Sequence, residues 1–238
     1  MERIYRQRVK VEDLVSFHIA VKETDLWVSA DRNLERKAEN LVFDCRTRLE
    51  EYISAHEFFL TTLQPYPKDP FAPSMIKTMI EMTSRAGVGP MASVAGAIAQ
   101  FVGEGLLQFT DQVIVENGGD IFLKTLRPAI VSIYAGESPL SEKFGLKIPT
   151  QQMPLGICSS SGTIGHSLSM GVADLVCTIA SSAVLADGAS TALCNRIKNK
   201  TDLEGIPHWA GQIPGLMGGI AIMGDSMIPW GDVELVGL

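Results

Sequence analysis

The apolar and polar residues in the first part of the chain follow two different periods. Between residues 3 and 28, the segments IYRQRVKV, LVSFHIAVKE and DLWVS alternate or run in β-branched and aromatic residues, with charged breaks at residues 12–13 and 24–25. This pattern predicts an antiparallel meander. From residue 34 to residue 53, apolar positions instead recur every three or four residues between charged ones, which predicts an amphipathic helix lying on a sheet.

The later patterns predict helices bunched between strands. Helices are expected at 75–85 and 91–109, with Pro90 at the first turn of the second one. The Asn117-Gly118 dipeptide predicts a hairpin turn between strands at 111–116 and 120–125. Further strands are expected at 129–135, 143–148, 155–159 and 174–180, a helix at 182–196, and closing strands in the glycine-broken tail. This distribution favours an α+β fold with antiparallel sheets.

Proline content and length predict how the chain is organised. Residues 64–74 contain four of the twelve prolines, and each proline restricts the residue before it, so a surface loop or linker is expected there. A chain of 238 residues can form one large compact domain or two intimate halves. We expect a single domain over residues 1–238 with a proline-rich loop at 64–74.

Composition narrows the classes of partner. The net charge is −7, the mean hydropathy is +0.16, and lysine and arginine do not cluster, which argues against binding to nucleic acid or an anionic membrane. The charged N-terminus lacks the apolar stretch of a secretory signal. Four cysteines occur singly without CxxC spacing, as is typical of reduced thiols in the cytoplasm. We therefore expect a cytoplasmic protein that does not cross a membrane.

The segment SSAVLADGASTALCN, residues 181–195, contains a single charged residue among small and apolar ones. Asp187 is the only formal charge between Asp174 and Arg196. A buried carboxylate must meet solvent, a cation or N–H donors, or else take up a proton. Thr191 lies one helical turn further on, so two hard oxygen ligands share a helix face, which suits Mg²⁺. The alternatives are an exposed helix face or an aspartate bonded to backbone amides.

Three other segments could take part in ligand binding. In VENGGDI, Asn117 to Asp120 form either a hairpin turn alone or a place of close backbone approach to a ligand. The loop CSSSGTIGHSLSMG could hold an anion on amides and hydroxyls, with His166 as proton donor or acceptor. The segment AGVGPMAS precedes a helix N-terminus, where free N–H groups favour a phosphate. No GxSxG elbow supports a serine nucleophile.

Together, VENGGDI, the Ser161-Gly162 pair of SSSGTIGH, and SSAVLADGASTAL resemble motifs of the ApbE-type FAD:protein FMN transferase superfamily. The chain as a whole resembles a short, uncharacterised cytosolic prokaryotic family of that superfamily. The resemblance implies a T-fold-like α+β arrangement with paired buried helices. It further implies that Asp187 and Thr191 ligate Mg²⁺, which in the transferases touches the FAD pyrophosphate.

The resemblance also implies roles for the remaining site residues, and the chain departs from the transferase pattern at two places. Cofactor contacts with FAD or another nucleotide are implied for Asn117, Gly118, Gly119, Asp120, Ser161 and Gly162. His166 matches the histidine that precedes an Asp-Pro in the transferases. That Asp-Pro and a Lys-Gly before the third helix are absent here, and cleavage of a phosphoanhydride needs positive charge or donors where negative charge develops. The resemblance therefore favours a metal-and-pyrophosphate pocket over full FMN transfer.

Two main hypotheses of function follow. In the first, the protein is an enzyme or binding protein that holds a small phosphate-bearing molecule, by default a flavin nucleotide, through Mg²⁺. In the second, it is a non-catalytic oligomeric scaffold or partner-binding module in which Asp187 is a structural acceptor. Hydrolysis of a phosphoester is a third possibility. Exposed strand edges make a homo-oligomer reasonable under any of them.

Overall fold

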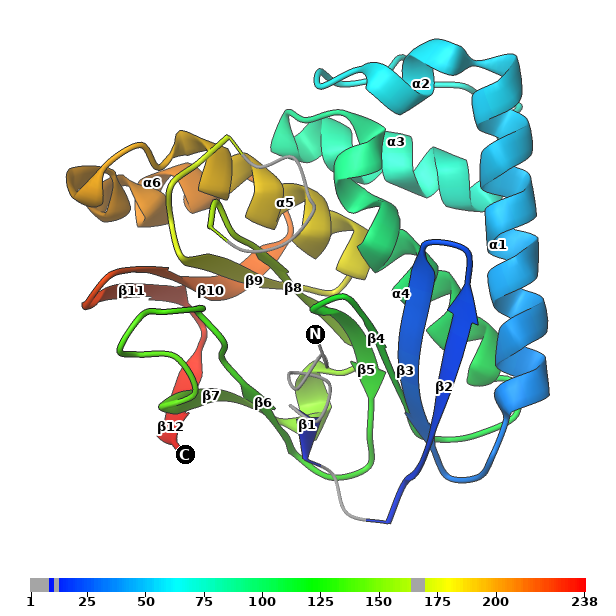
Figure 1. The fold of residues 1–238 in the computed structure, drawn as a ribbon, viewed down its shortest axis with the longest axis horizontal. Helices are drawn as coiled ribbons and strands as arrows, with labels where there is room; N and C mark the ends of the chain where they lie inside the picture. Colours follow the sequence, from blue (N-terminus) through cyan, green and yellow to red (C-terminus); the bar gives the residue numbers. More distant parts are fainter. Residues whose placement is uncertain (1–8, 11–12, 164–169) are drawn as a thin grey trace.

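A computed structural model describes residues 9–10, 13–163 and 170–238 in three layers, with helices above a large sheet and a small sheet below it (Figure 1). Every neighbouring pair of strands in the large sheet is antiparallel. The strand order is β11 (Ser226–Gly231), β10 (Leu216–Met223), β9 (Leu175–Ala180), β8 (Leu155–Ser160), β5 (Asp120–Lys124), β4 (Val113–Asn117), β3 (Thr24–Ala30) and β2 (Val15–Val21).

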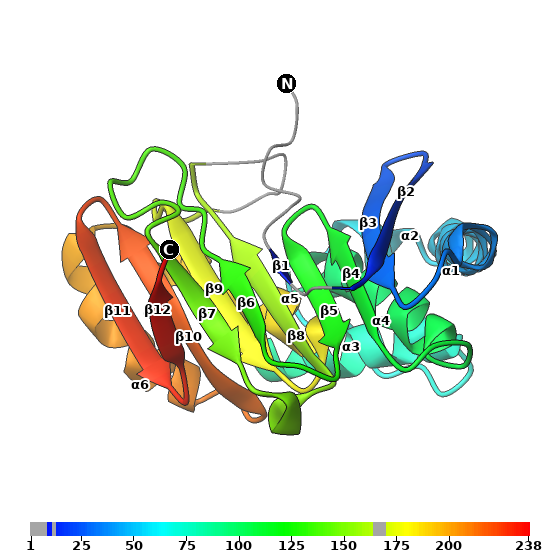
Figure 2. The same ribbon diagram turned by 90° about the horizontal axis from the view of Figure 1, so that it is seen from below.

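The small sheet covers part of the opposite face of the large sheet (Figure 2). Its order is β1 (Val9–Lys10), β6 (Ala129–Ser132), β7 (Phe144–Ile148) and β12 (Glu234–Gly237). The expected N-terminal meander is therefore partly wrong, because β1 pairs with β6 through Val9 and Val131 rather than with β2. Alternation predicts that a strand exists, whereas its partner is chosen by packing between distant segments.

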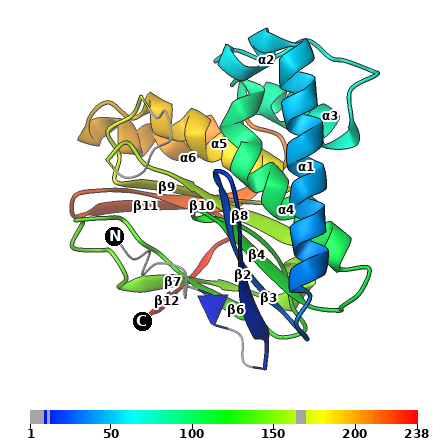
Figure 3. The ribbon, with the colours of Figure 1, turned by 45° about the vertical axis from the view of Figure 1, so that its right-hand side comes forward.

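The helices lie on the other face of the large sheet, and α1 runs along its β2–β3 side (Figure 3). In α1, the expected apolar stripe is buried at Ala38, Val42, Cys45, Leu49 and Tyr52. Two helices were not expected, because five or six residues are too few to show a period. The helices are α1 (Glu35–Ala55), α2 (Glu57–Thr61), α3 (Ser74–Ala86), α4 (Val94–Leu106), α5 (Ala183–Arg196) and α6 (Ile206–Gly211).

Across the described ranges, no single helix has both the length and the apolar character needed to cross a bilayer. In the part of the chain that the structure describes, one pair, α3 and residues Pro90–Leu106, reaches these values together, and this pair is bent by 100°.

The turn between β4 and β5 differs by one residue from the expected one. Asn117 pairs with Asp120, so Gly118 and Gly119 form the two-residue loop, with φ angles of 67° and 110°. Hairpin loops with positive φ at both central positions match the twist of the strands, and glycine adopts this conformation without strain. The double glycine therefore fixes where the strands end and sets Asn117 and Asp120 opposite each other.

Two glycines allow α5 to approach its neighbours closely. A Cβ placed on Gly156 of β8 would lie 2.1 Å from the Cα of Ala183, the first residue of α5. A Cβ on Gly96 of α4 would lie 2.4 Å from the carbonyl oxygen of the same alanine. The start of α5 is thus held tightly between the sheet and α4, which brings Asp187 to the first turn of α4.

A buried carboxyl cluster at the start of helix α4

Asp187 is attached to the backbone of another helix. Its side chain is almost fully buried, and its Oδ2 accepts a hydrogen bond of 2.8 Å from the backbone N–H of Gly96. The N–H groups in the first turn of a helix have no partner within the helix itself. Of the alternatives that the sequence leaves open, bonding to backbone amides is the one seen here. The structure begins α4 at Val94, so the N–H of Gly96 lies in its first turn and is used by Asp187.

Asp120 lies close to Asp187 in the same buried region. Its Oδ1 accepts a hydrogen bond of 3.1 Å from the backbone N–H of Ser159. Burial raises the pKa of Asp120 to about 7 against the lowering effect of that bond, and repulsion from Glu116 adds to the rise. Burial, followed by the charge of Asp120, likewise raises the pKa of Asp187 well above its ordinary value.

Asn117 connects the hairpin to the same turn of α4. Its Nδ2 donates a 3.0 Å hydrogen bond to the carbonyl oxygen of Ala95, next to the N–H that binds Asp187. On the other face of the hairpin, Glu116 Oε1 accepts a 2.7 Å bond from the N–H of Gly119. The structure therefore brings Asn117 and Asp187, two of the residues selected from sequence, to the first turn of α4, and Asp120 lies opposite Asn117 in the hairpin.

The other selected residues have different positions. Thr191 lies half-buried one helical turn beyond Asp187 on α5. A Cβ on Gly118 or Gly119 would meet nothing within 4 Å, so their turn faces open space. Ser161 Oγ accepts from the N–H of Thr163 at 3.0 Å, and the N–H of Gly162 donates to the carbonyl of Ala173 at 2.9 Å. His166 lies outside the described residues.

Cys158 is a member of this cluster that the sequence did not single out as a site residue. Its thiol donates to the carbonyl of Ala183 at 3.3 Å, and the neighbouring charges of Asp120 and Asp187 add to the burial that raises its pKa. Such a thiol stays protonated and unreactive. All four cysteines are buried and free, as expected. We define the carboxyl cluster as Asp120, Cys158 and Asp187.

The chain is similar to known proteins over most of its length. A family model described as "AbpE bacteria" matches residues 6–207. The chain belongs to this family. The UPF0280 protein of Methanocella arvoryzae is 38% identical over 212 residues, which cover 89% of this chain and 86% of the relative. That of Methanosphaerula palustris is 39% identical over 223 residues, covering 92% of each.

Solved structures share the fold at low sequence identity. The apo flavinyl transferase ApbE of Pseudomonas stutzeri aligns with a TM-score of 0.62 and 12% identity, covering 91% of this chain and 94% of that one. The flavin transferase ApbE of Vibrio cholerae aligns with a TM-score of 0.58 and 13% identity, covering 93% and 97%. Both the expected membership of the ApbE-like superfamily and the mixed architecture with antiparallel sheets are confirmed. The T-fold label and the single-domain boundaries stay predictions.

Proposed function

We propose that the protein binds a small phosphate-bearing molecule, with a flavin nucleotide as the first candidate, through Mg²⁺ held by Asp187 and Thr191. The family and the flavin transferase fold of the solved neighbours support this choice of ligand. The observation that carries the proposal is the buried carboxyl cluster, in which Asp187 accepts from the Gly96 N–H, Asp120 accepts from the Ser159 N–H, and the charge of Asp120 reaches Asp187.

The donor set fits a hard divalent cation. Among the described residues, neither Asp120 nor Asp187 forms an ion pair with a lysine or arginine, and the charge of Asp120 adds to the burial that raises the pKa of Asp187. A divalent cation would offset both negative charges. Mg²⁺ needs only one or two protein carboxylates and completes its shell with water and phosphate oxygens. In the described ranges no three His, Cys, Asp or Glu residues are grouped to hold a metal, so the ligand itself would supply part of the shell.

The surrounding backbone suits the rest of the ligand. Gly118 and Gly119 leave open space beside the hairpin, so a dinucleotide can approach their backbone without meeting a side chain. Ser161 and Gly162, just after β8, are proposed to complete the nucleotide contacts. When bound, Mg²⁺ would neutralise charge on the pyrophosphate. His166 remains the proposed proton donor or acceptor.

Binding is proposed rather than transfer of FMN. The chain has HSLSMG where the transferases have Asp-Pro after the histidine, and GVGPMAS where they have Lys-Gly. These departures remove groups that would stabilise negative charge developing on a cleaved pyrophosphate. Hydrolysis of a phosphoester has only the metal pair in its favour.

A second candidate role is structural. The bond from the Gly96 N–H to Asp187 ties α4 to α5, and this alone explains an acidic residue at position 187. In that case the protein is an oligomeric scaffold, and the carboxylate serves only to hold the two helices together.

Equilibrium binding of FAD distinguishes the two roles. We expect FAD to bind in the presence of Mg²⁺ and to be released by EDTA. Asp187→Asn should abolish this binding, and Thr191→Val should weaken it. Asp225→Asn, at an exposed aspartate paired with Lys200, is the matched control and should bind as the wild type does. FAD binding that does not depend on Mg²⁺ and is unchanged in both variants would overturn the proposal. A change in the melting temperature of Asp187→Asn without a change in FAD binding would favour the scaffold.

A further inference from the structure

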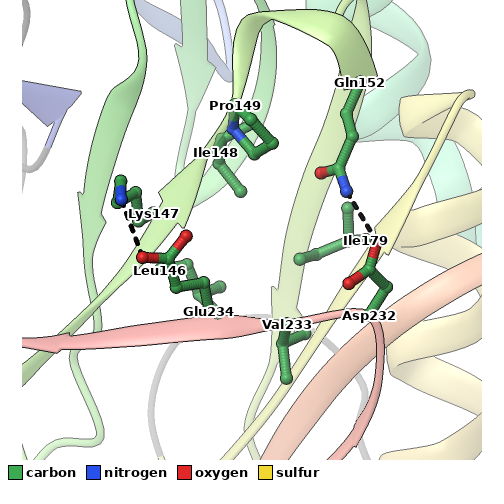
Figure 4. Close-up of a pocket in the computed structure, with 9 residues that line it drawn as sticks. All are labelled: Leu146, Lys147, Ile148, Pro149, Gln152, Ile179, Asp232, Val233 and Glu234. Carbon is green, nitrogen blue, oxygen red and sulfur yellow. Dashed lines mark hydrogen bonds and ion pairs between the residues drawn. The ribbon is translucent and has the colours of Figure 1, made fainter.

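A second feature of interest is a cavity of about 140 Å³ between the two sheets (Figure 4). It lies on the opposite face of the large sheet from α5. Thr178 of β9 points to the helices, where its Oγ1 donates to the carbonyl of Ala186, whereas Ile179 points into the core between the sheets. Successive side chains of a strand face opposite sides, so the cavity is separate from the carboxyl cluster.

The walls of this cavity divide into an apolar floor and a polar rim. Leu146, Ile148 and Ile179 are almost fully buried and form the floor, together with the partly buried Val233. Two polar pairs flank the apolar side chains, at positions more open to solvent (Figure 4). Lys147 contacts Glu234 at 2.7 Å, and Gln152 Nε2 donates to Asp232 Oδ2 at 3.0 Å.

The charges on the rim do not balance. Lys147 offsets the charge of Glu234. Among the described residues, the side chain that contacts Asp232 is the neutral amide of Gln152, which leaves the charge of Asp232 without an offset. One negative charge therefore faces the mouth of a cavity that has an apolar floor and a polar rim. A ligand that complements both the apolar floor and the negative charge of Asp232 has an apolar body and a positively charged head.

We propose that this cavity binds a small organic cation, a guanidinium or alkylammonium group joined to a short apolar body. Its volume is close to the roughly 150 Å³ of an engineered apolar cavity that takes up benzene, so it has room for about six or seven heavy atoms. The body contacts Ile148, Ile179 and Val233 while the head stays at the rim beside Asp232, as the stems and heads of arginine and lysine do at protein surfaces.

The same chemistry is offered by a free small cation and by an arginine side chain of a partner protein. Asp232 is exposed, and exposed ion pairs contribute little, so affinity in the millimolar range is expected for a single small cation. The contribution of the ion pair should also fall as ionic strength rises.

Methyl NMR on the intact chain tests the proposal with n-propylguanidinium and its neutral isostere n-propylurea. We expect propylguanidinium to shift the methyl signals of Ile148, Ile179 and Val233 and to leave that of Ile98 in α4 unmoved. Asp232→Asn should weaken its binding about two- to fivefold and not affect propylurea. Asp225→Asn should change neither, and Val233→Phe, which fills the cavity, should abolish the shifts.

The two sources are separated by adding acetyl-arginine methylamide. If it binds at least as tightly as propylguanidinium, the site takes an arginine side chain of a polypeptide. If only propylguanidinium binds, the site takes free small cations. The proposal is overturned if neither compound shifts the cavity methyls, if propylurea binds as well as propylguanidinium, or if Asp232→Asn leaves the affinity for propylguanidinium unchanged.

Discussion

The backbone N–H of Gly96 donates a 2.8 Å hydrogen bond to the Oδ2 of Asp187, which lies 91 positions further along the chain. The bond joins the first turn of α4 to the middle of α5, and a Cβ on Gly96 would lie 2.8 Å from the Cβ of Asp187. Close packing and hydrogen bonding therefore depend on each other at this point. Each can be tested by a separate substitution.

Asp187→Ala should destabilise the protein more than Asp187→Asn. Alanine leaves the buried N–H of Gly96 without its acceptor, which costs about 1–3 kcal/mol, whereas asparagine keeps an acceptor oxygen and carries no charge to bury. Urea unfolding of both variants in EDTA measures the free energy of unfolding without bound metal. Equal losses for the two variants would show that the hydrogen bond contributes nothing.

Gly96→Ala should also destabilise the protein, although alanine favours helices. The added methyl would lie 2.4 Å from the carbonyl oxygen of Ala183, a backbone atom that cannot move alone, and overpacking of this kind costs about 1–3 kcal/mol. Gly211→Ala is the matched control, because a Cβ there meets nothing within 4 Å. We expect Gly211→Ala to unfold at the same or a slightly higher urea concentration than the wild type, and Gly96→Ala at a lower one.

The hairpin turn predicts a ranking of substitutions at Gly118. Its φ of 67° strains any residue with a Cβ, but asparagine tolerates this region far better than a β-branched residue does. Gly118→Asn should therefore remain close to wild-type stability, while Gly118→Val should lose more than about 1 kcal/mol. Space does not explain the difference, because nothing lies within 4 Å of the added Cβ. Equal stability of the two variants would contradict the backbone explanation.

The sequence predicted elements better than their partners. The apolar stripe of α1 and the double glycine after β4 act over a few residues, so periodicity and turn chemistry reveal them. That Val9 pairs with Val131 depends on contacts between distant segments, which no local pattern contains. The short helices α2 and α6 are set by the packing around them rather than by a repeated pattern.

The candidate site was predictable in part for the same reason. Asp187 stood out because a lone charge in an apolar helix requires an explanation, and its proximity to Asn117 and Asp120 followed from the family resemblance. The bond to Gly96 could not be foreseen, because it depends on how α4 crosses α5. Cys158 gave no signal, since a single cysteine in an apolar strand is most simply a core residue.

The pKa of Asp120 predicts how stability depends on pH. Its folded-state pKa of about 7 lies above its ordinary value of 3.8, so between these values the folded protein holds a proton that the unfolded chain has released. The contribution of Asp120 to the free energy of unfolding should therefore fall as pH rises from about 4 to 7, by at most about 1.4 kcal/mol per pH unit for one proton, and then level off. Carboxylates whose pKa is lowered, such as Asp69 and Asp225, titrate below this window and act in the opposite direction.

Asp120→Asn should reduce the slope, because its amide takes up no proton in this range. Urea unfolding in EDTA at pH 5, 6, 7 and 8 measures the effect, with Asp225→Asn as a control that keeps the wild-type slope over these values. Part of the slope should remain in Asp120→Asn, since burial also raises the pKa of Asp187. A wild-type protein whose stability rises steadily from pH 5 to pH 7 would show that Asp120 is already ionised in the folded state. The carboxyl cluster would then carry the charge of Asp120 without an added cation, which removes a physical reason for placing Mg²⁺ there.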